Sequence, residues 1–265
     1  MKVALCLHGL FNSTTDRSSL GSDGYEHIKK HILDVVDTDV FIHSWEVDKI
    51  GRINELYKPT SASYQHQLDF TDFIKEKKLD KLQGVPRSPQ SVLSHLYSVT
   101  EVMKLVYNSN TTYDVVIKAR FDLGRINRNT SGPGKGNPFP VQCINFNPNI
   151  EADKIYMADW NHFHMGPADM WFYGSMDTMK PFTTLFDSLE EQMDMGSEFH
   201  QFATQIEGNG GDLSNSIAFY KWWMIQNGLW DNRINLETIE ESFLIKFNQM
   251  DQITNIKLFH INEVR

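Results

Sequence analysis

Cysteine is scarce in this sequence. Among its 265 residues only Cys6 and Cys143 occur. Two cysteines so far apart give neither a disulfide framework nor a cysteine-based zinc site. Such low usage is typical of a reducing compartment. We therefore expect a cytoplasmic protein, which for a viral protein means the host cytoplasm.

Basic stretches are also missing. The chain has 25 Lys and Arg against 34 Asp and Glu, a formal net charge of −9, and no basic run longer than that in EKKLDK (76–81). Nucleic-acid binding draws its affinity from Lys and Arg side chains placed along the phosphate backbone. The composition therefore argues against a nucleic-acid partner.

Long hydrophobic runs are absent as well. No window approaches the roughly 18 consecutive apolar residues of a membrane-spanning helix. The first apolar run, VALCL at 3–7, is too short for the core of a signal peptide, and no small-residue cleavage site follows it. We expect neither a transmembrane segment nor a secretion signal in this sequence.

A nucleophile elbow is the fourth absence. VALCLHG (3–9) ends in His8-Gly9, as the oxyanion loop of many α/β-hydrolases does, and such an enzyme needs a serine in a G-x-S-x-G turn. Ser175 follows Gly174 and Ser214 follows GGDL, and neither has glycine at both flanking positions. An α/β-hydrolase-like enzyme stays an alternative, but His8-Gly9 needs another explanation.

The patterns that are present predict an α/β protein. Hydrophobic residues make up 40% and charged residues 22%, as in an ordinary globular chain. VALCL is typical of a buried parallel strand, and GYEHIKKHILDVV (24–36) spaces Tyr25, Ile28, Ile32 and Val35 along one helix face. DVFIHSW (39–45) reads as a second strand, so the first 45 residues predict a βαβ unit and a parallel sheet.

The rest of the chain continues this alternation. A helix is predicted over SVLSHLYSVTEVMKLVY (91–107) and a strand over YDVVIKARFDL (113–123). Short strands are expected in KIYMADW (154–160) and MWFYGS (170–175), and helices over 178–191 and 214–228. Residues 124–152, rich in Gly, Pro and Asn, read as a long loop, and ESFLIKFN (241–248) as a possible last strand.

The most informative strand end is KARFDL. In an open parallel sheet ligands bind beyond the carboxyl ends of the strands, and strand alternation sets Lys118, Arg120 and Asp122 on one face. Arginine forks onto phosphate oxygens, and a carboxylate can hold a divalent cation that bridges a diphosphate. This pattern favours a phosphorylated ligand; the alternative is an internal ion pair between Arg120 and Asp122 at a sheet edge.

Three ordered segments resemble a known family. DVFIHSW is similar to D-x-F-I-H-T-W, YDVVIKARFDL to Y-D-x-x-I-R-x-R-x-D-L, and ADMWFYGSMDTM (168–179) to D-Q-F-x-x-G-S-x-x-x-M. These are signatures of glycosyltransferases of capsular and surface-polysaccharide synthesis from bacteria and large viruses. The resemblance covers residues 3 to about 228.

The resemblance implies a GT-A-like (Rossmann-like) fold with a mostly parallel central sheet flanked by helices. One domain, 1–265, would have a nucleotide-binding half at about 1–123 and an acceptor-side half at about 124–265. The implied reaction moves a sugar from a nucleotide-sugar donor, a UDP- or GDP-sugar, to a hydroxyl of a glycan acceptor in polysaccharide synthesis. A noncatalytic carbohydrate-binding module is a further alternative.

Residue roles follow from the same resemblance. Asp122 occupies the last position of a D-x-D element, where the carboxylate helps to bind Mn²⁺ or Mg²⁺ on the donor diphosphate. Arg120 stands where the first Asp would be, so Lys118 and Arg120 could instead neutralise the phosphates. Asp169 matches the Asp of the D-Q-F segment and is the candidate catalytic base, with Asp159 second, because a carboxylate can deprotonate the attacking hydroxyl.

Five more residues are candidates for binding the nucleotide sugar: His8, Gly9, His43, Trp45 and Gln90. Glycine at position 9 lets the backbone approach a nucleotide closely. His8 would lie beside the base or ribose, or serve as a structural strand-end histidine. Trp45, near His43, would stack on a base or sugar, or fill the core. The resemblance implies that Gln90 lies near the donor. Ser88 and Pro89, which come just before it, are explained by helix capping alone.

Two other patterns are weaker. His162 and His164 could form a transition-metal site with Asp169. The literal D-x-D of residues 37–39 precedes its strand and so belongs at the opposite sheet edge, where we interpret it as a turn.

Overall fold

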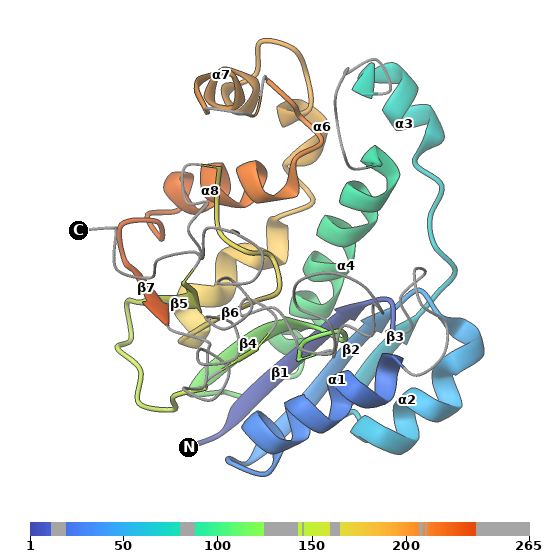
Figure 1. Ribbon diagram of the computed structural model, residues 1–265, viewed down its shortest axis with the longest axis vertical. Helices are drawn as coiled ribbons and strands as arrows, with labels where there is room; N and C mark the ends of the chain where they lie inside the picture. The colour runs from blue at the N-terminus through green and yellow to red at the C-terminus, as the bar shows by residue number, and fades with distance from the viewer. Residues whose placement is uncertain are drawn as a thin grey trace, which may run out of the picture.

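One mixed sheet organises the computed structural model, which describes residues 1–11, 20–79, 88–124, 143–144, 146–159, 165–206, 209 and 211–236. Within these residues the strand order is β3-β2-β1-β4-β6-β5-β7 (Figure 1). The first four strands of that order run parallel, β6 is antiparallel to both its neighbours, and β7 is parallel to β5. The strands are β1 (Val3–Gly9), β2 (Thr38–Ser44), β3 (Ser61–Tyr64), β4 (Val115–Arg120), β5 (Ile155–Ala158), β6 (Trp171–Gly174) and β7 (Arg233–Leu236).

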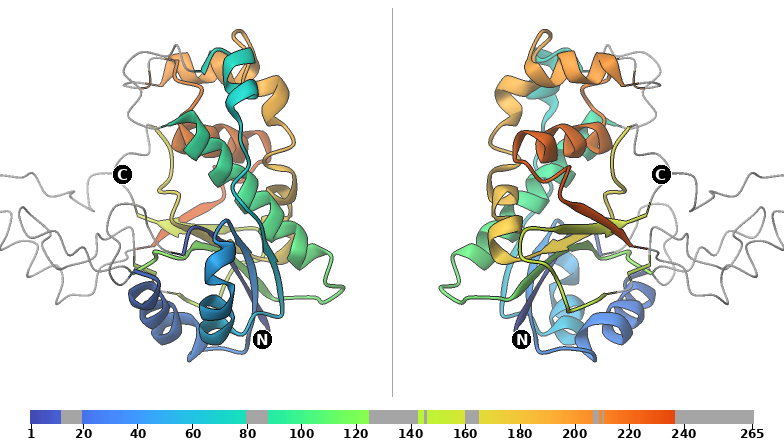
Figure 2. Two further views of the ribbon diagram at one scale, coloured as in Figure 1. Left: turned by 90° about the vertical axis from the view of Figure 1, so that its right-hand side faces the viewer. Right: turned by 90° about the vertical axis from the view of Figure 1, so that its left-hand side faces the viewer.

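Helices cover both faces of the sheet (Figure 2). One face packs against α1 (Leu20–Ile28), which continues as a π-helical turn over Lys29–Leu33, and against α2 (Ile50–Tyr57). The long helix α4 (Pro89–Tyr107) packs on the other face. Side chains of β1 alternate between the two layers: Val3, Leu5 and Leu7 face α1 and α2, whereas Ala4 and Cys6 face α4.

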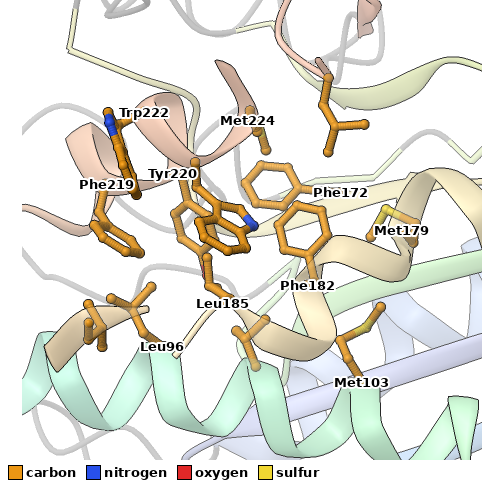
Figure 3. Packing of buried hydrophobic residues seen from close by; sticks show 14 of the residues in the cluster. Leu96, Met103, Phe172, Met179, Phe182, Leu185, Phe219, Tyr220, Trp222 and Met224 are labelled. Atoms are coloured by element: carbon orange, nitrogen blue, oxygen red, sulfur yellow. The ribbon is translucent and has the colours of Figure 1, made fainter. Parts of the chain in front are cut away.

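The α4 side holds the larger hydrophobic core. Helix α8 (Ser216–Gln226) is apolar almost all round, and its Tyr220 packs in one cluster with Leu96 of α4 and Phe172 of β6 (Figure 3). Phe172 of β6, Phe182 and Tyr220 pack together at its centre, with ring centroids 5.2 to 6.4 Å apart. The remaining helices are α3 (Thr71–Glu76), α5 (Met176–Met179), α6 (Leu189–Gln192) and α7 (Glu198–Gln205), with 3₁₀ turns over Val47–Lys49 and Lys180–Thr184.

Most predicted elements are confirmed: the initial βαβ unit, the helix at 91–107, the strand at 113–123, both later strands and the helix at 214–228. The predicted helix over 178–191 is wrong. It is broken into α5, a 3₁₀ turn and α6, and Pro181, which has no N–H to donate, lies at the break. Val35 is 53% exposed and not part of the buried stripe. The possible strand at 241–248 and most of 124–152 lie outside the described residues.

None of the helices in the described ranges is long and apolar enough to cross a membrane.

Gly24 marks the closest approach of α1 to the end of β4. A Cβ at Gly24 would lie 2.0 Å from the carbonyl oxygen of Phe121, a backbone atom that cannot move without shifting the strand end. We expect Gly24→Ala to lower the free energy of unfolding by about 2 kcal/mol or more, measured by urea denaturation. Gly51→Ala in α2 is the matched control, because a Cβ there meets nothing within 4 Å. We expect its free energy of unfolding to stay the same or to rise by up to about 1 kcal/mol, since alanine favours a helix more than glycine does. Equal stability of the two variants would contradict this packing.

Candidate functional site

A cleft of about 570 Å³ opens at the carboxyl edge of the parallel strands. Its walls come from the ends of β1, β2 and β4, from the first turns of α4, from the segment before β6 and from the start of α8. The parallel register places His8 beside both His43 and Arg120 at this edge. Of the predicted site residues, the structure brings His8, Gly9, Trp45, Arg120, Asp122 and Asp169 into the cleft lining.

Arg120 is the centre of the charged end of the cleft. Its guanidinium forks onto Asp122, donating from Nε to Oδ1 at 2.9 Å and from Nη2 to Oδ2 at 2.7 Å. A third contact joins Nη1 to Oδ1 of Asp169 at 3.4 Å. The two carboxylates hold the pKa of Arg120 above its ordinary value although burial acts in the other direction. The alternative reading, an ion pair between Arg120 and Asp122 at a sheet edge, is therefore confirmed, and the pair also lines the cleft.

Lys118 lies on the same strand face but does not reach the cleft. It is fully buried, its ammonium donates to the carbonyl oxygen of Asp169, and it lies over the rings of Phe172 and Tyr220 at 4.7 and 5.2 Å. Burial lowers the pKa of Lys118 to about 7, in spite of the nearby Asp169 carboxylate. Direct contact with phosphates does not fit this position; Lys118 instead fixes the Asp169 backbone and places charge behind it.

His8 is the least satisfied polar side chain of the cleft. It is 1% exposed, and within the described part of the chain neither ring nitrogen has a hydrogen-bond partner. Its ring meets His95 edge to face, with centroids 5.0 Å apart. Burial, and then the charges of Lys118 and other neighbouring cations, hold the pKa of His8 well below its ordinary value, so the imidazole is neutral. Buried polar atoms are usually paired in a protein interior, so His8 is suited to a ligand that supplies the missing partner.

Gly9 leaves open space at the cleft. Its φ is +94°, and a Cβ would meet nothing within 4 Å, so the side of the cleft stays open there. Its N–H donates to Ser98 Oγ at 3.0 Å, and the same hydroxyl lies 2.7 Å from Nδ1 of His43. His43 and Ser98 are fully buried and lie outside the cleft lining, so the predicted donor contact of His43 becomes a supporting role behind the strand ends.

This His43–Ser98 pair bears on the hydrolase alternative. The distance suits a base and a nucleophile, but a substrate cannot reach a hydroxyl that is 0% exposed. Ser175 caps α5 and donates to the carbonyl of Ala152, and Ser214 donates to Asp212. None of these serines is arranged as an activated nucleophile.

Trp45 lies at the end of the cleft opposite the charged residues, and Gln90 lies near that end. Trp45 lines the cleft but is only 6% exposed, packed against His43 and Tyr97. Gln90 is not in the cleft lining: its Nε2 donates to the carbonyl of Leu68 at 2.6 Å, and its Oε1 accepts from the N–H of Phe70 at 2.9 Å. Gln90 therefore holds the segment after β3 and has no group left for the donor.

Asp169 and Asp159 are separated by the strand order. Asp169 lines the cleft, with Oδ2 3.4 Å from Ser216 Oγ and 3.8 Å from Nε2 of His95. Asp159 follows β5, which lies beyond β6, and it does not line the cleft, so it does not fit the role of base. His162 and His164 lie outside the described residues. Asp39 of the D-x-D at 37–39 bonds to Lys2 and Tyr113 at the opposite sheet edge, as expected. The turn predicted there is wrong, because Thr38 and Asp39 are the first residues of β2.

The described residues fit a resident divalent cation poorly. Both oxygens of Asp122 accept hydrogen bonds from Arg120, and no group of three His, Cys, Asp or Glu side chains in the described ranges could hold an ion. Because hard cations require several oxygen ligands, we assign no step to a metal. The dependence on Mn²⁺ or Mg²⁺ that the resemblance implies stays a prediction.

Sequence reasoning missed several cleft residues: Gln67, Ser91, Ser94, His95 and Ser216. Three of them share one signal in the sequence. Ser94 and His95 follow Ser91 by three and four residues, so the three lie on one face near the start of a helix that is otherwise mostly apolar. Polar residues of a helix normally lie on its solvent-facing side. A polar stripe that instead faces the carboxyl ends of the strands indicates a binding site, because ligands bind at that edge of the sheet.

Comparison of the chain with protein-family models gives no match, and comparison with curated proteins gives none either.

Proposed function

We propose that the protein is a glycosyltransferase that moves a sugar from a nucleotide-sugar donor to the hydroxyl of a glycan acceptor, in a GT-A-like architecture. The observation that carries the proposal is the position of the Arg120–Asp122 pair. It lies in the same cleft as Gly9 and Trp45, at the carboxyl edge where open parallel sheets bind nucleotides. The motif resemblance in the sequence supports the same assignment.

The charge around the cleft suits a phosphate group in its middle. Arg120 faces the cleft, Lys118 lies behind Asp169, and both α4 and α8 begin at the cleft wall. Helix N-termini attract anions because their first N–H groups point outward. This applies to α4, which no side chain of the described residues caps, more than to α8, where Asn215 Oδ1 accepts from the N–H groups of Ile217 and Ala218. Two carboxylates oppose this attraction, so the diphosphate is expected at the remaining Nη1 and Nη2 hydrogens of Arg120, which neither Asp122 nor Asp169 accepts.

Transfer then needs a base on the acceptor side. The acceptor oxygen forms a bond to the anomeric carbon, the bond from that carbon to the diphosphate oxygen breaks, and the hydroxyl proton leaves to a base. Asp169 is the proposed base, because its carboxylate lines the cleft and is held by Arg120 and Ser216. His95 lies beside it and is hydrogen-bonded to Tyr220 at 2.8 Å.

Thermal-shift measurements with UDP-, GDP-, CMP- and dTDP-sugars test the proposal. One donor at about 100 times its dissociation constant should stabilise the protein by about 2.7 kcal/mol, a rise in melting temperature of several degrees. Each titration is run with Mn²⁺ and with EDTA, which also tests the cation prediction. If no donor raises the melting temperature, the proposal is wrong. If only glycans do, a carbohydrate-binding module replaces it.

A further inference from the structure

The two ends of the cleft differ in charge. Arg120, Asp122 and Asp169 belong to β4 and to the segment before β6. Beyond β1, on the β2 and β3 side, the residues that the structure describes in the lining carry no charged side chain; Trp45 follows β2, and Gln67 follows β3. Neighbouring strands lie about 4.8 Å apart, so β3 and β4 are about 14 Å apart across the sheet. The uncharged end therefore suits a neutral part of a ligand whose phosphates lie at Arg120.

Gln67 is held in one orientation at this uncharged end. Ser94 Oγ donates its proton to the carbonyl of Gln90 at 2.8 Å, so towards Gln67 it can only accept. The amide end of Gln67 that lies 2.8 Å from Ser94 Oγ is therefore the NH₂ group. Gln67 Oε1 and the second Nε2 hydrogen make no hydrogen bond with the described part of the chain.

The backbone on both sides of Gln67 is fixed as well. The N–H of Gln65 continues the sheet by donating to the carbonyl of Ser44 at 3.1 Å. On the other side, Gln90 holds the carbonyl of Leu68 and the N–H of Phe70. An exposed side chain on such a segment presents its free groups at a constant position, which is what a specificity-determining contact requires.

We infer that Gln67 is a specificity-determining residue that reads the hydrogen-bonding edge of the donor's nucleobase. The inference rests on the proposed function and names the substrate part that this end of the cleft recognises. The edge of a nucleobase carries a hydrogen-bond donor next to a hydrogen-bond acceptor. The free N–H and Oε1 of Gln67 can bond to such a pair of groups. Trp45 and Val92 also line the cleft and are uncharged, although each is at most 6% exposed.

Isothermal titration calorimetry of the full chain tests the inference with UDP, GDP, CDP, dTDP and inorganic pyrophosphate. The unaltered protein should bind at least one nucleoside diphosphate more tightly than pyrophosphate. Gln67→Ala should weaken that binding about tenfold, the loss of two neutral hydrogen bonds, and leave pyrophosphate binding unchanged. Ser94→Ala, which frees the Gln67 carboxamide, should give a smaller loss. His66→Ala is the matched control, because His66 is exposed on the same segment and outside the cleft lining.

The outcomes separate this inference from the proposed function. Failure of the unaltered protein to bind any nucleoside diphosphate overturns both. Normal nucleotide binding with equal affinities in Gln67→Ala and His66→Ala overturns the role of Gln67 alone. An equal loss for nucleotides and pyrophosphate in Gln67→Ala also overturns it, since the variant would then act through the phosphate end of the cleft.

Discussion

Replacing Asp122 by alanine is expected to abolish sugar transfer and donor hydrolysis while leaving the fold intact. The carboxylate is the half of the Arg120–Asp122 fork that sets the position of the guanidinium at the cleft. Without it, Arg120 keeps only the longer contact with Asp169 at 3.4 Å. Because a preorganised charge acts strongly on the transition state, activity should fall by about 100-fold or more. Release of nucleoside diphosphate from the donor that binds is the measurement.

One further variant tests why activity is lost, and another serves as a control. Asp122→Asn keeps an acceptor for Arg120 but removes the negative charge, so it separates positioning of the guanidinium from the charge itself. Asp187→Ala is the control, since Asp187 pairs with Lys104 at the surface, outside the cleft lining, and activity should not change. Circular dichroism and melting temperature confirm folding in each case. Unaltered activity in Asp122→Ala would remove the central assignment.

The arrangement of the site was predictable where parallel strands decide it. Continuous apolar runs identified β1, β2 and β4, and parallel pairing alone brings Gly9 and Asp122 to one edge. The edge strands were not predictable in this way. SASY of β3 has no run of large apolar residues, and β7 is only partly buried, so neither carries the pattern of a central strand.

The sequence also did not reveal how deep each side chain lies in the protein. Alternation correctly placed Lys118 and Arg120 on one face, but two residues along a strand are about 6.6 Å, which takes Lys118 from the strand end into the core. What lies above it, Phe172 and Tyr220, comes from elements distant in sequence. The prediction of Asp159 as a second candidate base does not fit for a related reason. Strand β6 lies between β5 and β4, which keeps Asp159 away from the cleft, and residue spacing does not reveal strand order.

Lys118 gives the second large expected effect, on stability as a function of pH. Burial lowers its pKa in the folded protein to about 7, against 10.5 ordinarily. Between these values the unfolded chain binds more protons than the folded one, so the contribution of Lys118 to stability rises with pH and is most unfavourable below 7. Relative to Lys118→Met, the free energy of unfolding of the unaltered protein should rise by on the order of 4 kcal/mol between pH 7 and pH 10.5.

Urea denaturation of both proteins across this pH range gives the difference, in which all other titrating groups cancel. Lys104→Met is the control. Glu101 and Asp187 outweigh the effect of burial and keep the pKa of Lys104 above its ordinary value, so its difference curve should be flat over most of the range. A flat curve for Lys118→Met as well would mean that Lys118 is not buried as a strained ammonium over Phe172 and Tyr220.

Binding of the donor should depend on pH in the opposite direction. The protonated ammonium of Lys118 lies behind Asp169 and attracts a diphosphate at Arg120, so that attraction is lost as pH rises through about 7. We expect the unaltered protein to bind the donor more tightly at pH 6 than at pH 9, and Lys118→Met to bind it weakly at both. The charge that costs stability at low pH is then the same charge that favours the phosphates, which accounts for a buried lysine in this position. Equal pH dependence of donor binding in both proteins would contradict that account.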